Sequence, residues 1–214
     1  MRVRLGKLSD GPVSRHLNRR FSSFITTKIL ARTGLTPNQV TWLVFLVTIA
    51  AAPAYALGLY CLAGILAQLG SMLDGCDGEL ARLKGMESRL GEFYDTVLDR
   101  YADIAVLAAA TYRLALDIGP WAAHLVWVAG LLAVSGSVMT SYTSLFVKRA
   151  LGGLDVAWPA VLSDSRDVRM LCLAAASLVA SFEPLALLAC LVWMAVVTNA
   201  KSWYRLVKAP EVFR

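Results

Sequence analysis

Long apolar segments constrain the fold of this chain most strongly, because each is close to the length that crosses a lipid bilayer. A transmembrane helix needs about 20 predominantly apolar residues. Hydrophobic residues make up 57% of the 214, more than ordinary soluble domains contain. We expect spans at about residues 36–57, 59–81, 90–115, 121–147, 168–181 and 184–207. The sequence therefore predicts an all-α membrane protein with six transmembrane helices, of which the fifth is the shortest.

An amphipathic segment, residues 13–33, precedes the first span. Apolar residues such as Phe24 and Ile25 recur at helical spacing, while arginine and lysine side chains occupy the other faces. This pattern is typical of a helix that lies in the membrane interface rather than across it. We therefore divide the chain into an interfacial amphipathic helix at 1–35 and a six-helix transmembrane domain at 36–214.

The distribution of basic residues predicts which ends of the spans face the cytosol. With a cytoplasmic N-terminus, the arginine and lysine residues beside the spans fall on the cytoplasmic side, and only Arg113 falls on the other. This asymmetry follows the positive-inside rule and favours a multi-pass protein of the cell membrane with both termini in the cytosol. The net charge of +6 then suits an anionic membrane surface, and we expect no nucleic-acid partner.

Aspartates interrupt the second and third apolar segments, close to the cytoplasmic side. An ionised group at mid-membrane costs about 2.5–3.5 kcal/mol on insertion scales, and acids within spans are by default candidates for function. Asp74 and Asp77 are three residues apart and share a helix face. Asp95 and Asp99 are four apart and also share a face. Carboxylates that converge from two neighbouring helices form an oxygen-rich site of the kind that magnesium, calcium or manganese prefers.

Small residues and one arginine surround the first aspartate pair. Gly75, Gly78 and Ala81 leave room for the close approach of a ligand or another helix. Arg82, one turn beyond Gly78, can hold a phosphate through two parallel hydrogen bonds. A carboxylate cluster for divalent metal beside such an arginine favours phosphoryl chemistry, with the active site open to the cytosol.

The same residues form a motif that resembles a known family signature. Residues 74–99 read D-G-C-D-G-E-L-A-R, then eight residues, then G-E-F-Y-D-T-V-L-D. They match D-x2-D-G-x2-A-R-x8-G-x3-D-x3-D, the signature of the CDP-alcohol phosphotransferases, at every fixed position. The stretch 35–38, L-T-P-N, also resembles the family, and so does the layout of six spans after an interfacial helix.

The resemblance implies a metal-dependent transferase that moves a phospho-alcohol from a CDP-alcohol donor to an acceptor hydroxyl and releases CMP. It implies two Mg²⁺ or Mn²⁺ ions beside the CDP pyrophosphate, Asp99 as the general base, and a homodimer. The implied metal ligands are Asp74, Asp77, Asp95 and Asp99. The implied nucleotide-binding residues are Asn38, Gly78, Ala81, Arg82 and Gly91. A cytidylyltransferase domain, fused to some relatives, is not recognised, so we expect the CDP-alcohol to be made elsewhere.

Basic residues near the fifth span bear on the acceptor. Family members that use inositol phosphate carry a basic cluster in this region, and here it would comprise Arg166 and Arg169. Lys148, just after the fourth span, could add to the same acceptor-phosphate pocket. Membrane anchoring by the positive-inside rule also explains these residues. The resemblance extends to synthases of di-myo-inositol phosphate phosphate and of phosphatidylinositol phosphate. A phosphorylated polyol, inositol phosphate, is therefore the expected acceptor, with glycerol phosphate as the alternative.

Two other classes of protein also use clustered acids. A cation-coupled transporter would place acids within its spans, but it leaves the spacing of Gly78, Ala81 and Arg82 unexplained. A prenyl-transfer enzyme would clamp pyrophosphate through magnesium, usually with acids adjacent in sequence. Metal-dependent release of CMP from a CDP-alcohol separates these classes. The role of Asp103 stays open between the site and a simple ion pair with Arg100.

Overall fold

The computed structural model describes residues 18–152, 155–156 and 165–213, which are helical apart from short connections. The helices in chain order are α1 (Arg19–Lys28), the 3-10 helix η2 (Leu30–Arg32), α2 (Pro37–Ile49), α3 (Ala51–Ala56), α4 (Tyr60–Leu73), α5 (Cys76–Lys84), α6 (Arg89–Asp117), α7 (Pro120–Ala150), α8 (Arg166–Ala180) and α9 (Leu185–Val212). The first part of the predicted amphipathic segment, residues 13–17, lies outside the described residues.

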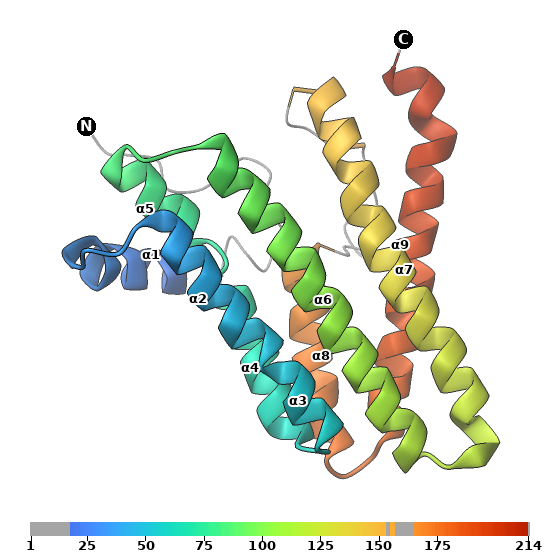
Figure 1. The fold of residues 1–214 in the computed structure, drawn as a ribbon. Coiled ribbons are helices and arrows are strands. Elements are labelled where there is room, and N and C mark those ends of the chain that lie inside the picture. Colours follow the sequence, from blue (N-terminus) through green and yellow to red (C-terminus); the bar gives the residue numbers. More distant parts are fainter. Residues whose placement is uncertain (1–17, 153–154, 157–164, 214) are drawn as a thin grey trace.

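The helices form an elongated bundle with two distinct ends (Figure 1). The turns α3–α4, α6–α7 and α8–α9 lie at the lower end of Figure 1, whereas α5 and the C-terminal ends of α7 and α9 reach the upper end. Helix α4 packs on α8, α7 packs on α9, and α6 contacts α2, α3 and α7. Tyr55, Leu107, Met170 and Leu191 are fully buried members of the apolar core among these helices.

Two of the predicted spans are each built from two helices. The first is divided at Ala50 into α2 and α3, because Pro53 lacks the N–H that would continue the helical hydrogen bonds. The second is divided at Asp74 and Gly75 into α4 and α5. Glycine has low helix propensity, and an aspartate side chain competes for backbone hydrogen bonds. The span predicted over residues 59–81 therefore consists of two helices rather than one.

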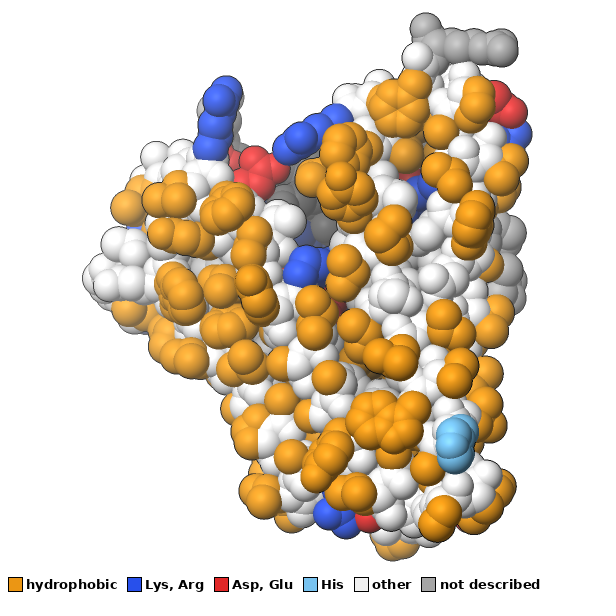
Figure 2. All heavy atoms as spheres, turned by 45° about the vertical axis from the view of Figure 1, so that its right-hand side comes forward, with side chains coloured by type: hydrophobic (Ala, Val, Ile, Leu, Met, Phe, Trp, Pro, Cys, Tyr) orange, Lys and Arg blue, Asp and Glu red, His pale blue; other side chains and the backbone are white. Residues whose placement is uncertain are grey.

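Three helical stretches in the described residues are long and apolar enough to cross a bilayer: Pro37–Ala56, Pro120–Ala150 and Leu185–Val212. Helix α6 has 29 residues but carries the aspartates, and α4 and α8 have 14 and 15 residues. Figure 2 shows apolar side chains spread along the length of the bundle, and many large ones are exposed, as expected of a protein in contact with lipid. In its described residues the chain is thus an all-helical membrane protein, and its count of six spans stays a prediction.

Helix α1 lies across the direction of the long helices in Figure 1 and packs on α5. Its buried side chains, Ser22 and Thr26, are polar. Phe24, in contrast, is 58% exposed. The helix therefore packs on the bundle through small polar side chains together with Ile25, and it leaves Phe24 exposed.

Hydroxyl side chains fill notches made by glycines where long helices pack. Thr198 of α9 sits against Gly136 of α7, and Thr111 of α6 sits against Gly130 of α7. Each hydroxyl donates to the carbonyl four residues earlier in its own helix, at 2.6 and 2.7 Å. Both hydroxyls are satisfied within the bundle, and the small residues let the helix backbones approach closely.

Replacing Gly136 by alanine is expected to destabilise the bundle by about 1–3 kcal/mol, because the added methyl group overpacks the contact between α7 and α9. A Cβ at this position would overlap the Thr198 hydroxyl and lie 2.5 Å from Asn199 Nδ2. Thermal unfolding of the purified variant measures the effect. Gly34→Ala is the matched control, since a Cβ there meets no atom within 4 Å. Equal unfolding temperatures for the two variants would contradict this packing.

Candidate active site

A large cavity opens between the helices in the half of the bundle that contains α5 and the ends of α7 and α9. Its volume is about 1170 Å³. Figure 2 shows the hollow, with acidic and basic side chains gathered at its mouth. Every residue proposed for the site from the sequence lines it: Asn38, Asp74, Asp77, Gly78, Ala81, Arg82, Gly91, Asp95, Asp99, Lys148, Arg166 and Arg169. The predicted residues are therefore brought together around one cavity.

The break between α4 and α5 positions the first aspartate pair. Asp74 is the C-cap residue that directly follows α4, and Asp77 lies in the first turn of α5. Helix α5 then ends at Gly85, whose φ of 63° is the left-handed conformation that glycine adopts without strain. The Lys84 ammonium donates to the carbonyls of Thr33 and Leu35 at 2.9 and 2.8 Å. This contact ties the end of α5 to the segment that leads into α2.

Helix α6 supplies the second aspartate pair. Its N-cap residue Ser88 accepts a hydrogen bond from Gly91 N at 3.0 Å, which fixes where the helix begins. Asp95 and Asp99 then face the break between α4 and α5. One carboxylate oxygen from each of Asp74, Asp95 and Asp99 lies within 4.8 Å of the other two. The convergence of acids from two helices, predicted from their spacing, is confirmed for these three residues.

These carboxylates fit a hard divalent cation. The three side chains are half-buried and offer only oxygen, the donor that magnesium and manganese prefer. Asp74 follows α4, and Asp95 and Asp99 are both on α6. The same three acids also line a second, small cavity of about 10 Å³. This volume is close to that needed for one water or one ion. The polar lining of this cavity is Thr41, Thr48, Asp74, Asp77, Asp95 and Asp99. All four predicted metal ligands thus border one confined space.

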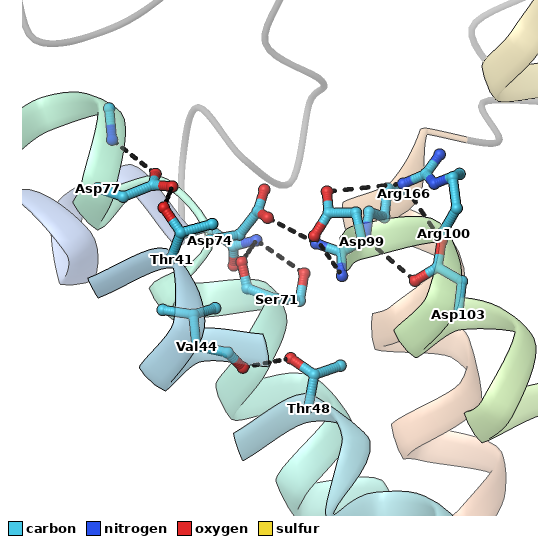
Figure 3. A network of polar contacts seen from close by, with 12 residues as sticks. Thr41, Val44, Thr48, Ser71, Asp74, Asp77, Asp99, Arg100, Asp103 and Arg166 are labelled. Carbon is cyan, nitrogen blue, oxygen red and sulfur yellow. Dashed lines mark hydrogen bonds and ion pairs between the residues drawn. The ribbon is translucent and has the colours of Figure 1, made fainter. Parts of the chain in front are cut away.

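Asp77 is arranged differently from the other three acids. Its oxygens are not part of the group that lies within 4.8 Å. Oδ2 accepts a hydrogen bond from the Thr41 hydroxyl at 2.6 Å, and Oδ1 accepts one from Gly78 N at 2.6 Å. Figure 3 shows Asp77 held between these two donors, beside Asp74. Asp77 as a metal ligand therefore stays a prediction.

Arg166, at the start of α8, reaches into the acidic cluster. Its Nη1 lies 2.7 Å from Asp74 Oδ1, and its Nη2 lies 3.2 Å from Asp99 Oδ1. Its Nε donates to Asp103 Oδ1 at 3.1 Å. Figure 3 shows the guanidinium group between the acids of the two helices. Arg166 was a candidate from its position near the fifth span. Its direct contact with two predicted metal ligands, Asp74 and Asp99, could not be predicted from the sequence.

Asp103 pairs with more than the single arginine considered from the sequence. Its carboxylate lies 3.4 Å from Arg100 Nη2, 3.1 Å from Arg166 Nε and 3.8 Å from Arg169 Nη2. The residue is 1% exposed, and Arg169 is 2% exposed. Arg100 also contacts Asp99, at 3.6 Å, and donates to the Ser141 hydroxyl. Asp103 is therefore the buried anion that holds three guanidinium groups beside the cavity.

The predicted nucleotide-binding residues line the side of the cavity formed by α2, α5 and α6. Asn38 Oδ1 lies 3.1 Å from the position that a Cβ on Gly91 would take, so α2 and α6 meet closely there. The Arg82 guanidinium lies over Gly78, 3.5 Å from the position of a Cβ on that glycine. A larger side chain at Gly91 would crowd Asn38, and one at Gly78 would crowd Arg82. Both of these residues are proposed to contact the nucleotide.

Two buried charged pairs beside the cavity were not singled out from the sequence. Glu79 is fully buried, and its Oε1 accepts from Arg19 Nη1 at 2.9 Å and from the Ser22 hydroxyl at 2.8 Å. This contact docks α1 onto α5. Arg205 of α9 is 3% exposed and is paired with Asp155. The two residues are 50 positions apart, so this pairing leaves no local signal in the sequence.

Comparison with known proteins identifies relatives for most of the chain. A family model described as CDP-alcohol phosphatidyltransferase matches residues 34–203. The chain is 44% identical over 135 residues to the bifunctional IPC transferase and DIPP synthase of Thermococcus kodakarensis, which covers 63% of this chain and 29% of that protein. It is 38% identical over 116 residues to the archaetidylinositol phosphate synthase of Pyrococcus horikoshii, covering 54% and 57%. The chain thus spans less than two thirds of either relative's length.

The fold is also similar to a solved structure. The phosphatidylinositol phosphate synthase of Mycobacterium tuberculosis with CDP-DAG bound superposes with a TM-score of 0.72 at 25% identity, covering 87% of this chain and 92% of that one. The structure of the same protein in complex with manganese and citrate also has a TM-score of 0.72, covering 86% and 87%. Both likenesses extend over nearly all of the helical bundle.

Proposed function

Because the chain belongs to the CDP-alcohol phosphatidyltransferase family, we propose that it transfers a phospho-alcohol from a CDP-alcohol to an acceptor hydroxyl and releases CMP. The observation that carries this proposal is the approach of Asp74, Asp95 and Asp99 to within 4.8 Å of one another at a cavity of about 1170 Å³. A cluster of acids with arginines at its edge suits the binding of a pyrophosphate through divalent cations.

In the proposed reaction, the acceptor oxygen bonds to the phosphorus that carries the alcohol, and the bond from that phosphorus to CMP breaks. The proton of the acceptor hydroxyl passes to the Asp99 carboxylate, and CMP leaves with the electron pair of the broken bond. Bound Mg²⁺ or Mn²⁺, expected as two ions, would neutralise charge that develops on the phosphate oxygens. The residues that would hold the ions are Asp74, Asp77, Asp95 and Asp99.

The donor nucleotide would occupy the side of the cavity lined by α2, α5 and α6. Asn38, Gly78, Ala81 and Gly91 would shape this side, and Arg82 would contact the pyrophosphate by a charge-assisted hydrogen bond. The tuberculosis relative has been crystallised with CDP-DAG, which supports a CDP-linked donor for this chain.

The acceptor would lie on the opposite side, toward α7, α8 and α9. Arg166 is the best-placed acceptor-phosphate residue, because its guanidinium already lies between Asp74 and Asp99. Lys148 lines the same cavity, whereas Arg169 is buried against Asp103 and would act by supporting Arg166. The name of the Pyrococcus relative supports inositol phosphate as the acceptor. Glycerol phosphate is the alternative.

The membrane arrangement forms part of the proposal. Six spans would be made by α2 with α3, α4 with α5, α6, α7, α8 and α9, as one domain over residues 36–214. Helix α1 would lie in the membrane interface with Phe24 toward lipid, as part of a separate unit over residues 1–35. The cavity would face the cytosol, and two copies of the chain would form a homodimer.

Purified protein in lipid nanodiscs should release CMP from a CDP-alcohol only when both Mg²⁺ and the acceptor are present. Mass spectrometry of the products, with lipid-linked and soluble CDP-alcohols and with inositol phosphate or glycerol phosphate, identifies both substrates. Product formation with inositol phosphate is expected. No CMP release from any donor, together with cation flux in vesicles, would instead support a transporter.

A further inference from the structure

Thr41 of α2 contacts the one predicted metal ligand that lies apart from the others. Its hydroxyl oxygen lies 2.6 Å from Asp77 Oδ2 and 3.2 Å from Pro37 O. A hydroxyl has one proton, and a distance of 2.6 Å is typical of donation to a charged carboxylate. The proton therefore lies toward Asp77, although the two residues are 36 positions apart and on different helices.

The second oxygen of Asp77 also has a donor. Gly78 N donates to Oδ1 at 2.6 Å, so the two oxygens are held by donors from α2 and α5. Asp77 is 9% exposed and Thr41 is 6% exposed, which leaves little water to replace either contact. Two fixed donors set the plane of the carboxylate, which still has lone pairs to offer a cation.

The orientation of Asp77 matters because its side chain lines the small cavity between the predicted metal ligands. The cavity of about 10 Å³ is lined by Thr41 and Asp77 together with Asp74, Asp95 and Asp99. Figure 3 shows the Thr41 side chain reaching from α2 to Asp77, with Asp74 nearby. A rotation of the Asp77 side chain would change how its oxygens border this small cavity.

We propose that Thr41 is a positioning residue that holds the Asp77 carboxylate at the wall of the small cavity that it shares with the other three acids, so that all four bind divalent cation together. This inference rests on the proposed function for its link to turnover, but its direct consequence is for cation affinity. The signature that covers residues 74–99 does not include Thr41, so its role follows from the contact between α2 and α5.

The chain offers a closely matched control for the Thr41 hydroxyl. Thr48 is also on α2, two turns further on, is 1% exposed, and lines the same small cavity. Its hydroxyl donates to Val44 O at 2.9 Å and to no acid. A Thr→Val change at either position removes a hydroxyl and keeps the side-chain shape, but only the change at Thr41 removes a donor to a carboxylate.

The affinity of each purified full-length variant for Mn²⁺, measured by electron paramagnetic resonance, tests the proposal. Thr41→Val is expected to weaken the affinity about tenfold or more, the usual effect of losing a hydrogen bond to a charged group. Thr48→Val is expected to stay within about twofold of wild type, since its hydroxyl serves only its own helix. In the transfer assay, kcat of Thr41→Val should fall while KM for the CDP-alcohol changes little at saturating metal.

A second pair of variants isolates the hydroxyl if Thr41→Val folds poorly. Thr41→Ser and Thr41→Ala both remove the methyl group of the threonine side chain, but only Thr41→Ser keeps the hydroxyl. Thr41→Ser should therefore keep near wild-type Mn²⁺ affinity, whereas Thr41→Ala should bind Mn²⁺ more weakly. Unchanged Mn²⁺ affinity in Thr41→Val or Thr41→Ala, or equal losses in the Thr41 and Thr48 variants, would overturn the positioning role. Normal Mn²⁺ binding by wild type without CMP release from any donor would reject the proposed function instead, and the comparison of affinities would still decide the role of Thr41.

Discussion

Asp99→Asn is expected to lower kcat by about 10³-fold to 10⁴-fold, because the amide cannot take the acceptor proton that a general base removes. The change keeps the size and shape of the side chain beside Asp95 and Asp74. Binding of the CDP-alcohol should survive, since the roles proposed for Asn38 and Arg82 are unaffected. Single-turnover CMP release measures the loss of turnover, and calorimetry with the CDP-alcohol and Mg²⁺ measures donor binding.

Glu92→Gln is the matched control for this experiment. Glu92 lies on the same helix and lines the same cavity, but it is exposed and is not in the acidic cluster. Its amide variant should retain turnover within about twofold of wild type. Substantial turnover by Asp99→Asn would remove Asp99 as the base, and loss of donor binding would mean that its main role is to hold metal.

Asp103→Asn is expected to reduce the free energy of unfolding by about 3–5 kcal/mol, because it removes a buried charge that pairs with closely packed arginines. Among the described residues, Asp103 contacts Arg100, Arg166 and Arg169 within 4 Å. The same change removes the negative charge that faces Arg166 Nε and so weakens the contact that positions this guanidinium. KM for the phosphorylated acceptor should therefore rise in preparations that remain folded. Thermal unfolding and acceptor titration measure the two effects.

The opposite end of α6 provides a control for the Asp103 variant. Asp117 pairs with Arg113 at 2.6 Å, but the side chains are 24% and 31% exposed. Asp117→Asn should cost less than about 1 kcal/mol, because an ion pair in contact with solvent is weak. Equal losses of stability at Asp103 and Asp117 would contradict the view that the buried cluster of arginines depends on Asp103.

Spacing within the sequence was sufficient to predict the centre of the candidate site. Aspartates three or four residues apart share a helix face, and apolar segments on both sides imply that the two helices are neighbours. The approach of Asp74 to Asp95 and Asp99 agrees with this expectation, whereas Asp77 lies on α5, beyond the break after α4, and is not part of the group. Hydropathy did not reveal the break at Asp74 and Gly75. An average over a long window changes little when it includes only two polar or small residues.

Contacts between distant segments account for what the sequence did not predict. Arg166 is 92 residues from Asp74, and Arg19 is 60 residues from Glu79. A positive-inside bias predicts that basic residues occur at the cytoplasmic side, but it does not say which acid each one meets. Thr41 had no signal of its own, since a threonine early in an apolar helix is ordinary. Such pairings depend on how the helices pack.

Anomalous X-ray scattering from crystals of the full chain grown with Mn²⁺ tests the metal site most directly. A peak is predicted at coordination distance from the carboxylates of Asp74, Asp95 and Asp99, with Asp77 turned toward it, and Asp74→Asn should weaken that peak. The account would be contradicted by Mn²⁺ bound elsewhere in the protein, or by side chains of these three residues that face different directions and share no ion.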